Sequence, residues 1–192
     1  MADKKKSVAV YLGSHEGNDP SFMRVAREFG RYLARGGYRL IYGGASVGTM
    51  GALANGCMEE GGECIGVFPV GFKGKPEIAA EGGEVAKKDL SRVIECANFK
   101  ERKQIMEDES DCCVALPGSW GTLDELFTYA SNSELKFNGG KKLFVLNSDG
   151  YFNPLKEMIS NMYRNGFIQE YSTHLITFCD NLDELMGCLA EI

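Results

Sequence analysis

The residues most suited to chemistry lie in a short glycine-bearing segment before a predicted helix. The segment Gly118-Ser119-Trp120-Gly121-Thr122 follows the apolar run 112–116, which is typical of a buried strand, and leads into a helix predicted from Thr122. Unpaired backbone N–H groups and the positive end of the helix dipole meet at such a junction, and glycine lets a ligand approach the backbone closely. We therefore expect this loop to bind an anion such as a phosphate group, with Glu125 beside it.

Two residues of this segment have two interpretations each. Thr122-Leu123-Asp124-Glu125 fits a capping box, in which Thr122 is the N-cap and the Glu125 carboxylate bonds back to its N–H. Alternatively, Glu125 lies beside the phosphate site, where a sugar attached to that phosphate would be. Trp120 either stacks on a base or ribose, or packs as a lid or against the core. From spacing alone, the structural roles are the more common ones.

Two further glycine loops follow predicted strands. Gly13 and Ser14 follow the strand 7–12, and Gly43 and Gly44 follow the strand 38–42. These residues either serve tight turns and packing or offer N–H and hydroxyl groups to a ligand. None of the three loops has the Gly-x-x-x-x-Gly-Lys-Ser/Thr or Gly-x-Gly-x-x-Gly pattern, so a dinucleotide cofactor is not supported.

A basic pair lies on the helix predicted over 92–109. Phe99, Arg102, Lys103 and Met106 share one face by their spacing. If Phe99 and Met106 face the core, a cation is carried toward it, and a buried cation needs an anionic partner. The alternative is that both cations extend to the surface and pair with nearby acidic side chains.

The apolar runs alternate with helical patterns along the whole chain. Strands are predicted at 7–12, 38–42, 64–68, 112–116, 142–147 and 175–178. Helices are predicted at 20–35, 92–109, 154–165 and 182–192; a further helix follows the Gly43–Gly51 segment and ends at about 60, and another begins at 122. Residues 70–91 are predicted to be a loop with a short strand or turn that could fold over a site. This alternation predicts a single α/β domain over 1–192, with a Rossmann-like, doubly wound parallel sheet and helices on both faces. Since parallel strands end at one rim, the three glycine loops are expected to meet there.

Composition excludes several classes of function. The 192 residues carry a net charge of −6, so no overall basic surface for nucleic acid or anionic membrane is expected. No apolar stretch reaches the roughly 18–20 residues that span a membrane, and the N-terminus lacks the apolar segment of a signal peptide. Seven scattered cysteines without Cys-x-x-Cys indicate buried free thiols in a cytoplasmic protein. The two histidines are far apart in sequence and neither is near a cysteine pair, so no metal site is expected.

Several segments together resemble one known family. Pro117-Gly118-Ser119-Trp120-Gly121-Thr122-Leu123-Asp124-Glu125 resembles the Pro-Gly-Gly-x-Gly-Thr-x-x-Glu signature of the "Lonely guy" (LOG) proteins. These are cytokinin riboside 5'-monophosphate phosphoribohydrolases, long labelled lysine decarboxylases. Further similar segments are Gly13-Ser14, Tyr42–Gly51, Glu101–Met106 and Leu146–Tyr151. The resemblance covers nearly the whole chain.

The resemblance implies a function and a set of site residues. The reaction would be hydrolysis of the N-glycosidic bond of a nucleoside 5'-monophosphate, either a cytokinin riboside monophosphate or AMP, to free base and ribose 5-phosphate. Arg102 and Glu125 would be catalytic, and no cofactor or metal would be needed. Substrate contacts would come from Gly13, Ser14, Gly43, Gly44, Glu77, Lys103, Gly118, Ser119, Trp120, Gly121 and Thr122. The family also implies a homodimer.

This sequence departs from the family pattern at two places. Ser119 replaces the second glycine of the signature, and Asn98-Phe99-Lys100 replaces Ser-Met-His, so contacts to the base are expected to differ. An alternative function is a nucleotide-binding or sensor protein of the same fold without turnover. A pyridoxal phosphate decarboxylase would need a Schiff-base lysine; none lies in the glycine loops, and Lys103 is the closest.

Overall fold

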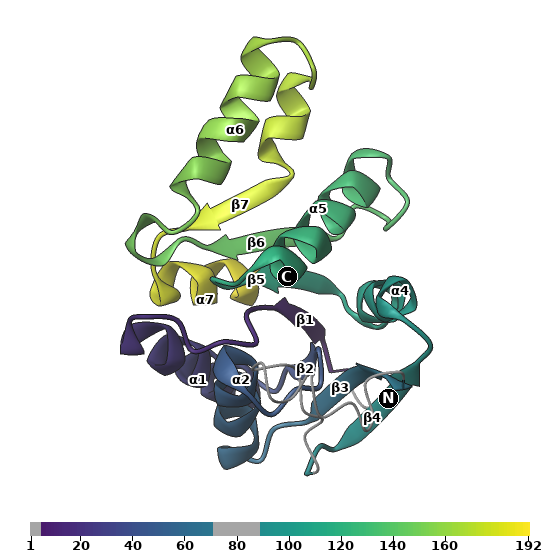
Figure 1. Cartoon of the computed structure of the whole chain (residues 1–192), viewed down its shortest axis with the longest axis vertical. Helices are drawn as coiled ribbons and strands as arrows, with labels where there is room; N and C mark the ends of the chain where they lie inside the picture. The colour runs from purple at the N-terminus through teal and green to yellow at the C-terminus, as the bar shows by residue number, and fades with distance from the viewer. Residues whose placement is uncertain (1–4, 71–88) are drawn as a thin grey trace.

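The described part of the chain forms a seven-stranded parallel sheet (Figure 1). The computed structural model describes residues 5–70 and 89–192; Glu77 and most of the predicted loop 70–91 lie outside these ranges. The strand order is β4-β3-β2-β1-β5-β6-β7. The strands are β1 (Ser7–Tyr11), β2 (Arg39–Tyr42), β3 (Cys64–Pro69), β4 (Arg92–Cys96), β5 (Cys112–Ala115), β6 (Lys142–Leu146) and β7 (Ile176–Cys179).

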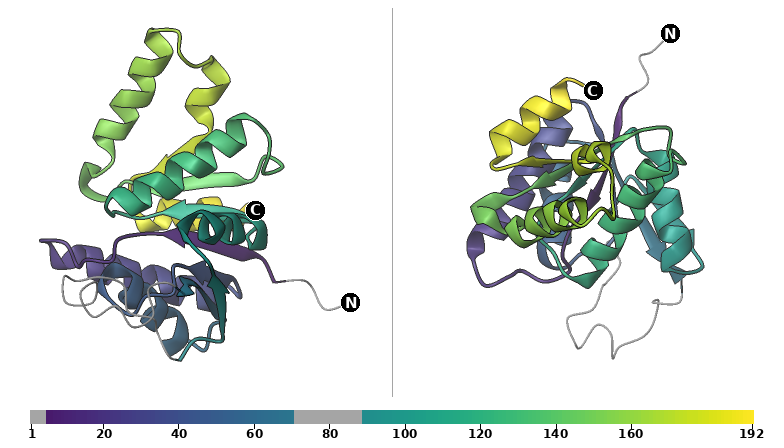
Figure 2. Two further views of the ribbon diagram at one scale, coloured as in Figure 1. Left: turned by 45° about the vertical axis from the view of Figure 1, so that its right-hand side comes forward. Right: turned by 90° about the horizontal axis from the view of Figure 1, so that it is seen from above.

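Helices cover both faces of the sheet, because alternate residues of each strand point to opposite sides. Val8 and Val10 pack with α1 (Pro20–Arg35), α2 (Gly48–Glu59) and α7 (Leu182–Ala190). Ala9 and Tyr11 pack with α4 (Phe99–Glu109), α5 (Trp120–Glu134) and α6 (Asn153–Arg164). Figure 2 shows α6 extending beyond β7 at this edge of the sheet. The predicted doubly wound, Rossmann-like α/β fold is confirmed.

The predicted helix 92–109 is wrong in its first part. Arg92–Cys96 is strand β4, which pairs in parallel with β3, so the described sheet has seven strands rather than six. The helix begins only at Phe99, because the Asn98 side chain accepts a hydrogen bond from the N–H of Glu101. The Glu101 carboxylate in turn accepts the N–H of Ala97 at 2.6 Å. These two bonds form a variant of the capping box, in which the carboxylate accepts the N–H of the residue before the N-cap, and they separate the strand from the helix.

The strand order reverses at β1, and the candidate site lies there. The chain runs from β1 through β2 and β3 to β4 in one direction, whereas β5, β6 and β7 extend in the other. In such sheets, ligands bind at the carboxyl ends of the strands beside this reversal. A Cβ on Gly118 would lie 2.9 Å from the backbone nitrogen of Gly13, and one on Gly48 would overlap the backbone of Ser14. The prediction that the three glycine loops share one rim is therefore confirmed.

The cysteines, all within the described residues, are free. Six are buried and Cys188 is partly exposed. Burial is the main cause that raises the pKa of the Cys112 thiol to about 12, so this thiol stays protonated. Over residues 5–70 and 89–192, no helix is both long and apolar enough to cross a bilayer. Within the same ranges, no group of three or more His, Cys, Asp or Glu side chains is arranged to hold a metal ion.

Candidate functional site

The N-terminus of α5 lacks the cap that the sequence suggested. The helix begins at Trp120 with Ser119 as its N-cap, and the Ser119 side chain makes no capping hydrogen bond. Thr122 is therefore the third residue of the helix, and the capping box built on Thr122 and Glu125 is wrong. The first turn also contains no acidic residue. The helix end thus presents N–H groups and a positive dipole end that its own side chains do not neutralise.

The hydroxyl of Thr122 lies buried beneath this helix end. Thr122 is 2% exposed, and its Oγ1 has no hydrogen-bond partner among the described residues. A Cβ on Gly118 would overlap this hydroxyl, so glycine is required for the loop to pack as it does. A buried polar atom without a partner is costly, and a bound ligand would provide one.

Arg102 is buried at the junction of α4 with the glycine loop after β2. The residue is 3% exposed. A Cβ on Gly43 would overlap its guanidinium, so Gly43 leaves the space that this side chain occupies. The guanidinium carbon also lies 5.5 Å from the centre of the Phe99 ring. Of the two alternatives for the basic pair, the buried cation is confirmed for Arg102, although Phe99 is 43% exposed.

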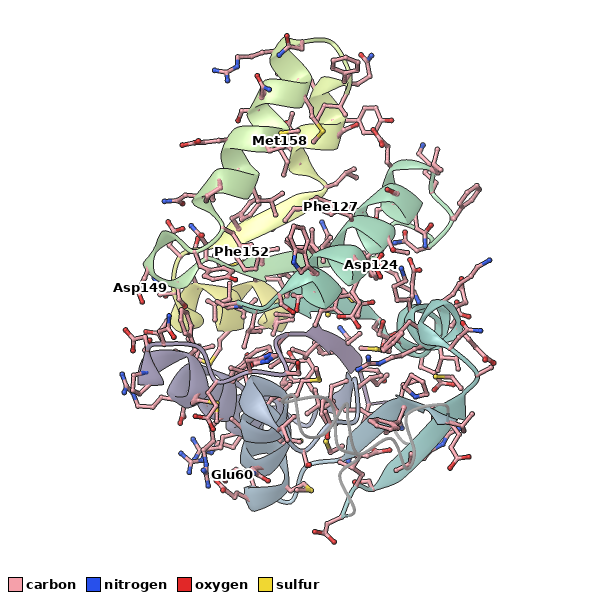
Figure 3. The ribbon with its side chains drawn as sticks, viewed as in Figure 1. Glu60, Asp124, Phe127, Asp149, Phe152 and Met158 are labelled. Atoms are coloured by element: carbon pink, nitrogen blue, oxygen red, sulfur yellow. The ribbon has the colours of Figure 1, made fainter. Side chains whose placement is uncertain are left out.

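Lys103 joins α4 to α5 through two residues that sequence reasoning missed. Its Nζ donates to both carboxylate oxygens of Asp124 at 2.8 Å and to Oγ1 of Thr128 at 2.9 Å. Asp124, labelled in Figure 3, lies where α5 approaches α4. Asp124 and Thr128 are four residues apart on a predicted helix, so the sequence alone could have placed them on one face of that helix.

A pocket of about 360 Å³ collects most of the predicted site residues. Its lining includes Ser14, Arg102, Lys103, Ser119, Trp120, Gly121, Thr122 and Glu125, together with Phe99, Asp124, Leu12 and Met50. Trp120 is 85% exposed at its edge, so packing of Trp120 into the core is excluded. Gly43 does not line the pocket itself but lies directly against the Arg102 guanidinium, which does. Gly44, with a φ of +77°, faces Gly66 and Phe68 of β3.

Glu125 lies half-buried in this pocket together with Leu12 and Ser14, which come just after β1. Glu125 lies close enough to Tyr11, the last residue of β1, for its charge to affect the pKa of the Tyr11 hydroxyl. Burial is the largest cause that raises the pKa of the Tyr11 hydroxyl, Cys113 adds to it, and the charge of Glu125 contributes a smaller part. Glu125 also contributes to the raised pKa of Cys113, where burial again dominates.

A second pocket of about 200 Å³ lies against the same loop. Gly13, Gly118 and Ser119 line it together with Phe22 and Tyr151. Ser119 therefore borders both pockets. Neither Phe22 nor Tyr151 was among the predicted site residues, although Tyr151 ends the Leu146–Tyr151 segment of the family resemblance.

Comparison with known proteins decides the family. A sequence profile described as "Possible lysine decarboxylase" matches residues 50–189. A cytokinin riboside 5'-monophosphate phosphoribohydrolase from Rhodococcoides fascians is 34% identical over 187 residues, which cover 97% of this chain and 89% of that protein. The chain belongs to the LOG family. Another LOG protein, cytokinin riboside 5'-monophosphate phosphoribohydrolase LOG5 from Arabidopsis thaliana, is 33% identical and covers 94% of this chain and 75% of its own length.

Solved structures share the fold of this LOG protein. The molybdenum cofactor binding protein from Rippkaea orientalis has a TM-score of 0.72 at 20% identity, covering 99% of this chain and 98% of that one. The molybdenum cofactor carrier protein from Chlamydomonas reinhardtii has a TM-score of 0.66 at 19% identity, covering 98% of each chain. At this identity, the likeness shows the fold alone.

Proposed function

We propose that this LOG protein hydrolyses the N-glycosidic bond of a nucleoside 5'-monophosphate and releases the free base and ribose 5-phosphate. The proposal depends chiefly on one observation: a single pocket places Glu125 and Arg102 beside the uncapped N-terminus of α5. It is supported by relatives of about one-third identity that are named cytokinin riboside 5'-monophosphate phosphoribohydrolases.

The phosphate would bind at the start of α5. N–H groups of the Gly118–Thr122 segment and the helix dipole favour a dianion there, and the buried Thr122 hydroxyl supplies a further donor. The net charge of the protein is −6, so local geometry rather than overall charge must attract the ligand. Binding the phosphate fixes the attached ribose in the pocket, and this converts an encounter into an oriented reaction.

The chemical step would take place between the ribose and Glu125. The bond from the ribose C1' to the base nitrogen breaks, and positive charge develops on the sugar as the base departs. The Glu125 carboxylate stabilises that charge and accepts a proton from the attacking water, whose oxygen bonds to C1'. The departing base takes up one proton from solvent, and Glu125 later returns its proton to solvent, so that one water is consumed for each bond broken. Arg102 places a buried positive charge in the same pocket, which would attract the phosphate.

The base would be recognised at the pocket edge. Phe99 and Trp120 line the pocket and are both exposed, so they offer ring faces to a planar base. AMP and cytokinin riboside monophosphates share the purine ring, and they are the substrates we propose. Lys103 supports the site by holding Asp124 and Thr128, which fixes α4 against α5.

The test is a carboxylate-to-amide substitution in the pocket. Glu125→Gln keeps the size of the side chain but removes its charge and its capacity to accept a proton, so we expect AMP hydrolysis to fall by at least about 1000-fold. Adenine release is measured by chromatography, and AMP affinity by calorimetry. Glu157→Gln, the same change on the exposed surface of α6, serves as the control. Wild-type protein that binds AMP without releasing adenine would support a nucleotide-binding protein without turnover instead.

We also propose that the chain acts as a cytoplasmic homodimer. Large apolar side chains are exposed on α5 and just after it, at Phe127, Leu135 and Phe137. Exposed apolar groups of this kind are typical of interaction surfaces. Sedimentation of the wild-type protein and of a Phe127→Glu variant would test the dimer; equal monomeric behaviour of both would contradict it.

A further inference from the structure

Tyr151 connects the proposed phosphate loop, Gly118–Thr122, to the turn after β6. Its hydroxyl donates a hydrogen bond of 2.5 Å to the backbone carbonyl of Gly118. Tyr151 belongs to the turn after β6 and lines the 200 Å³ pocket on one side of the loop. The loop also borders the pocket that contains Glu125, because Ser119 lines both pockets.

The direction of this carbonyl determines the direction of the next N–H. Among the described residues there is no cis peptide bond, so the peptide between Gly118 and Ser119 is trans. In a trans peptide, the C=O and the N–H point in opposite directions. With its carbonyl held toward Tyr151, the peptide points the Ser119 N–H away from Tyr151, and the other pocket that Ser119 lines is that of Thr122 and Glu125.

The Tyr151 ring is itself held in place by aromatic contacts. It meets Phe152 edge-on, with 4.9 Å between ring centres, and Phe22 of α1 at 5.9 Å. These geometries are the favoured ones for aromatic pairs. The ring therefore has little freedom to follow the carbonyl if the loop peptide rotates.

The turn that presents Tyr151 is fixed by a buried asparagine. Oδ1 of Asn147 accepts the N–H of Phe152 at 2.7 Å, and its Nδ2 donates to Asn153 and Asp180. The turn also contains Asp149, labelled in Figure 3, whose φ of +53° is uncommon for a residue other than glycine. A connected set of bonds thus runs from the end of β7 to the phosphate loop.

We propose that Tyr151 is a positioning residue for the anion site: by fixing the Gly118 carbonyl, it directs the Ser119 N–H at the phosphate of the substrate. Glycine at 118 lacks a Cβ, so its peptide would otherwise rotate easily. The inference rests on the proposed function, because the phosphate that the Ser119 N–H would bind is that of the proposed substrate. Tyr151 lies outside the pocket that contains Glu125. Tyr151 itself touches no reacting atom.

The test compares two tyrosine-to-phenylalanine variants. Tyr151→Phe removes only the hydroxyl, and Tyr163→Phe makes the same change on the exposed surface of α6. The probe is ribose 5-phosphate, titrated calorimetrically. We expect Tyr151→Phe to bind it about tenfold more weakly, as for loss of one orienting hydrogen bond. Tyr163→Phe should match the wild type. For AMP, KM should rise more than kcat falls.

Amide NMR gives a second measurement that does not depend on activity. In ¹⁵N-labelled wild type, the Ser119 amide should shift on addition of ribose 5-phosphate, and in Tyr151→Phe this shift should shrink. Unchanged affinity and unchanged amide shift in Tyr151→Phe would overturn this inference alone, provided that Glu125→Gln is inactive. A wild-type chain that does not bind ribose 5-phosphate would overturn the proposed function as well.

Discussion

The N-termini of α4 and α5 face the same pocket but are built in opposite ways. At α4, Asn98 accepts the N–H of Glu101 and Glu101 accepts the N–H of Ala97, so the helix end is closed by its own side chains. At α5, the Ser119 side chain makes no such bond and the first turn has no acid. The first end is satisfied without a ligand, whereas the second remains available to an anion.

The capped N-terminus of α4 contributes to stability, whereas the uncapped N-terminus of α5 leaves N–H groups available for binding. A side-chain N-cap is worth about 1 kcal/mol to a helix, so the uncapped start of α5 forgoes stabilisation that α4 obtains. The N-terminus of α7 is capped in the same way as that of α4, since the Asn181 side chain accepts the N–H of Glu184. At α4, the side chain that reaches the pocket lies one turn further along the helix, since Arg102 occupies the space left by Gly43.

The largest predicted effect comes from closing the open helix end. Ser119→Asp places a carboxylate at the N-cap of α5, where it would bond the free N–H groups and repel a phosphate. We expect affinity for ribose 5-phosphate to fall by about 100-fold or more, because like charges in an interface cost several kcal/mol. Urea unfolding should show stability unchanged or raised by about 0.5–1 kcal/mol.

Ser119→Asn is the matched control for this change. It has a similar size and capping capacity but no charge, so its loss of affinity should be much smaller. Equal phosphate-ester binding by Ser119→Asp and wild type would show that the anion does not bind at α5, and the contrast between the two helix ends would have no functional meaning.

The next effect concerns the side chain that α4 contributes. Gly43→Ala would force the buried Arg102 guanidinium to move, so we expect AMP turnover to drop by about tenfold to 100-fold with a smaller change in ribose 5-phosphate affinity. Gly187→Ala on α7 is the control, because a Cβ there meets no atom within 4 Å. Steady-state kinetics measure both. Wild-type turnover in Gly43→Ala would contradict the role given to Arg102.

The sequence predicted the fold well because its signals are local. Apolar runs alternate with helical periodicity, and Gly36-Gly37 and Gly61-Gly62 mark helix ends, so strand and helix positions followed directly. The meeting of three glycine loops at one rim followed from parallel topology alone. The error at 92–109 arose because Val93 and Ile94 are compatible with either element; only the Asn98–Glu101 box, which was overlooked, separates them.

The candidate site was predictable in composition but not in detail. Burial of Arg102 was one of two open alternatives, since a repeat of apolar positions does not say how the cation packs; contact with Gly43 decides it. The bonds from Lys103 to Asp124 and Thr128, and from Tyr151 to Gly118, join segments distant in the chain. Such contacts depend on how helices pack on the sheet, and no local pattern specifies them.

A smaller effect tests the closed end. Asn98→Ala removes the hydrogen bond to the Glu101 N–H and should lower the free energy of unfolding by about 1 kcal/mol. Ser119→Ala removes a side chain that makes no cap bond, and it should cost clearly less. Urea unfolding of both variants measures the difference. If both changes cost the same, the two helix ends do not differ in capping as the structure indicates.

The smallest predicted effect is the pH dependence of a third capped helix, α1, whose N-cap Asp19 is an ionisable residue. Asp19 caps α1 by accepting the N–H of Ser21 at 2.7 Å, and this bond is the largest cause that lowers the pKa of its carboxyl below 3.8. Because the folded pKa lies below the unfolded one, the stabilisation is present above the unfolded value and is lost as the pH falls through the folded value. Asn also caps helices but does not titrate, so the stability difference between wild type and Asp19→Asn should shrink only in acid. Urea unfolding of both proteins between about pH 5 and pH 2.5 measures this, and a difference independent of pH would show that the Asp19 cap has no charged component.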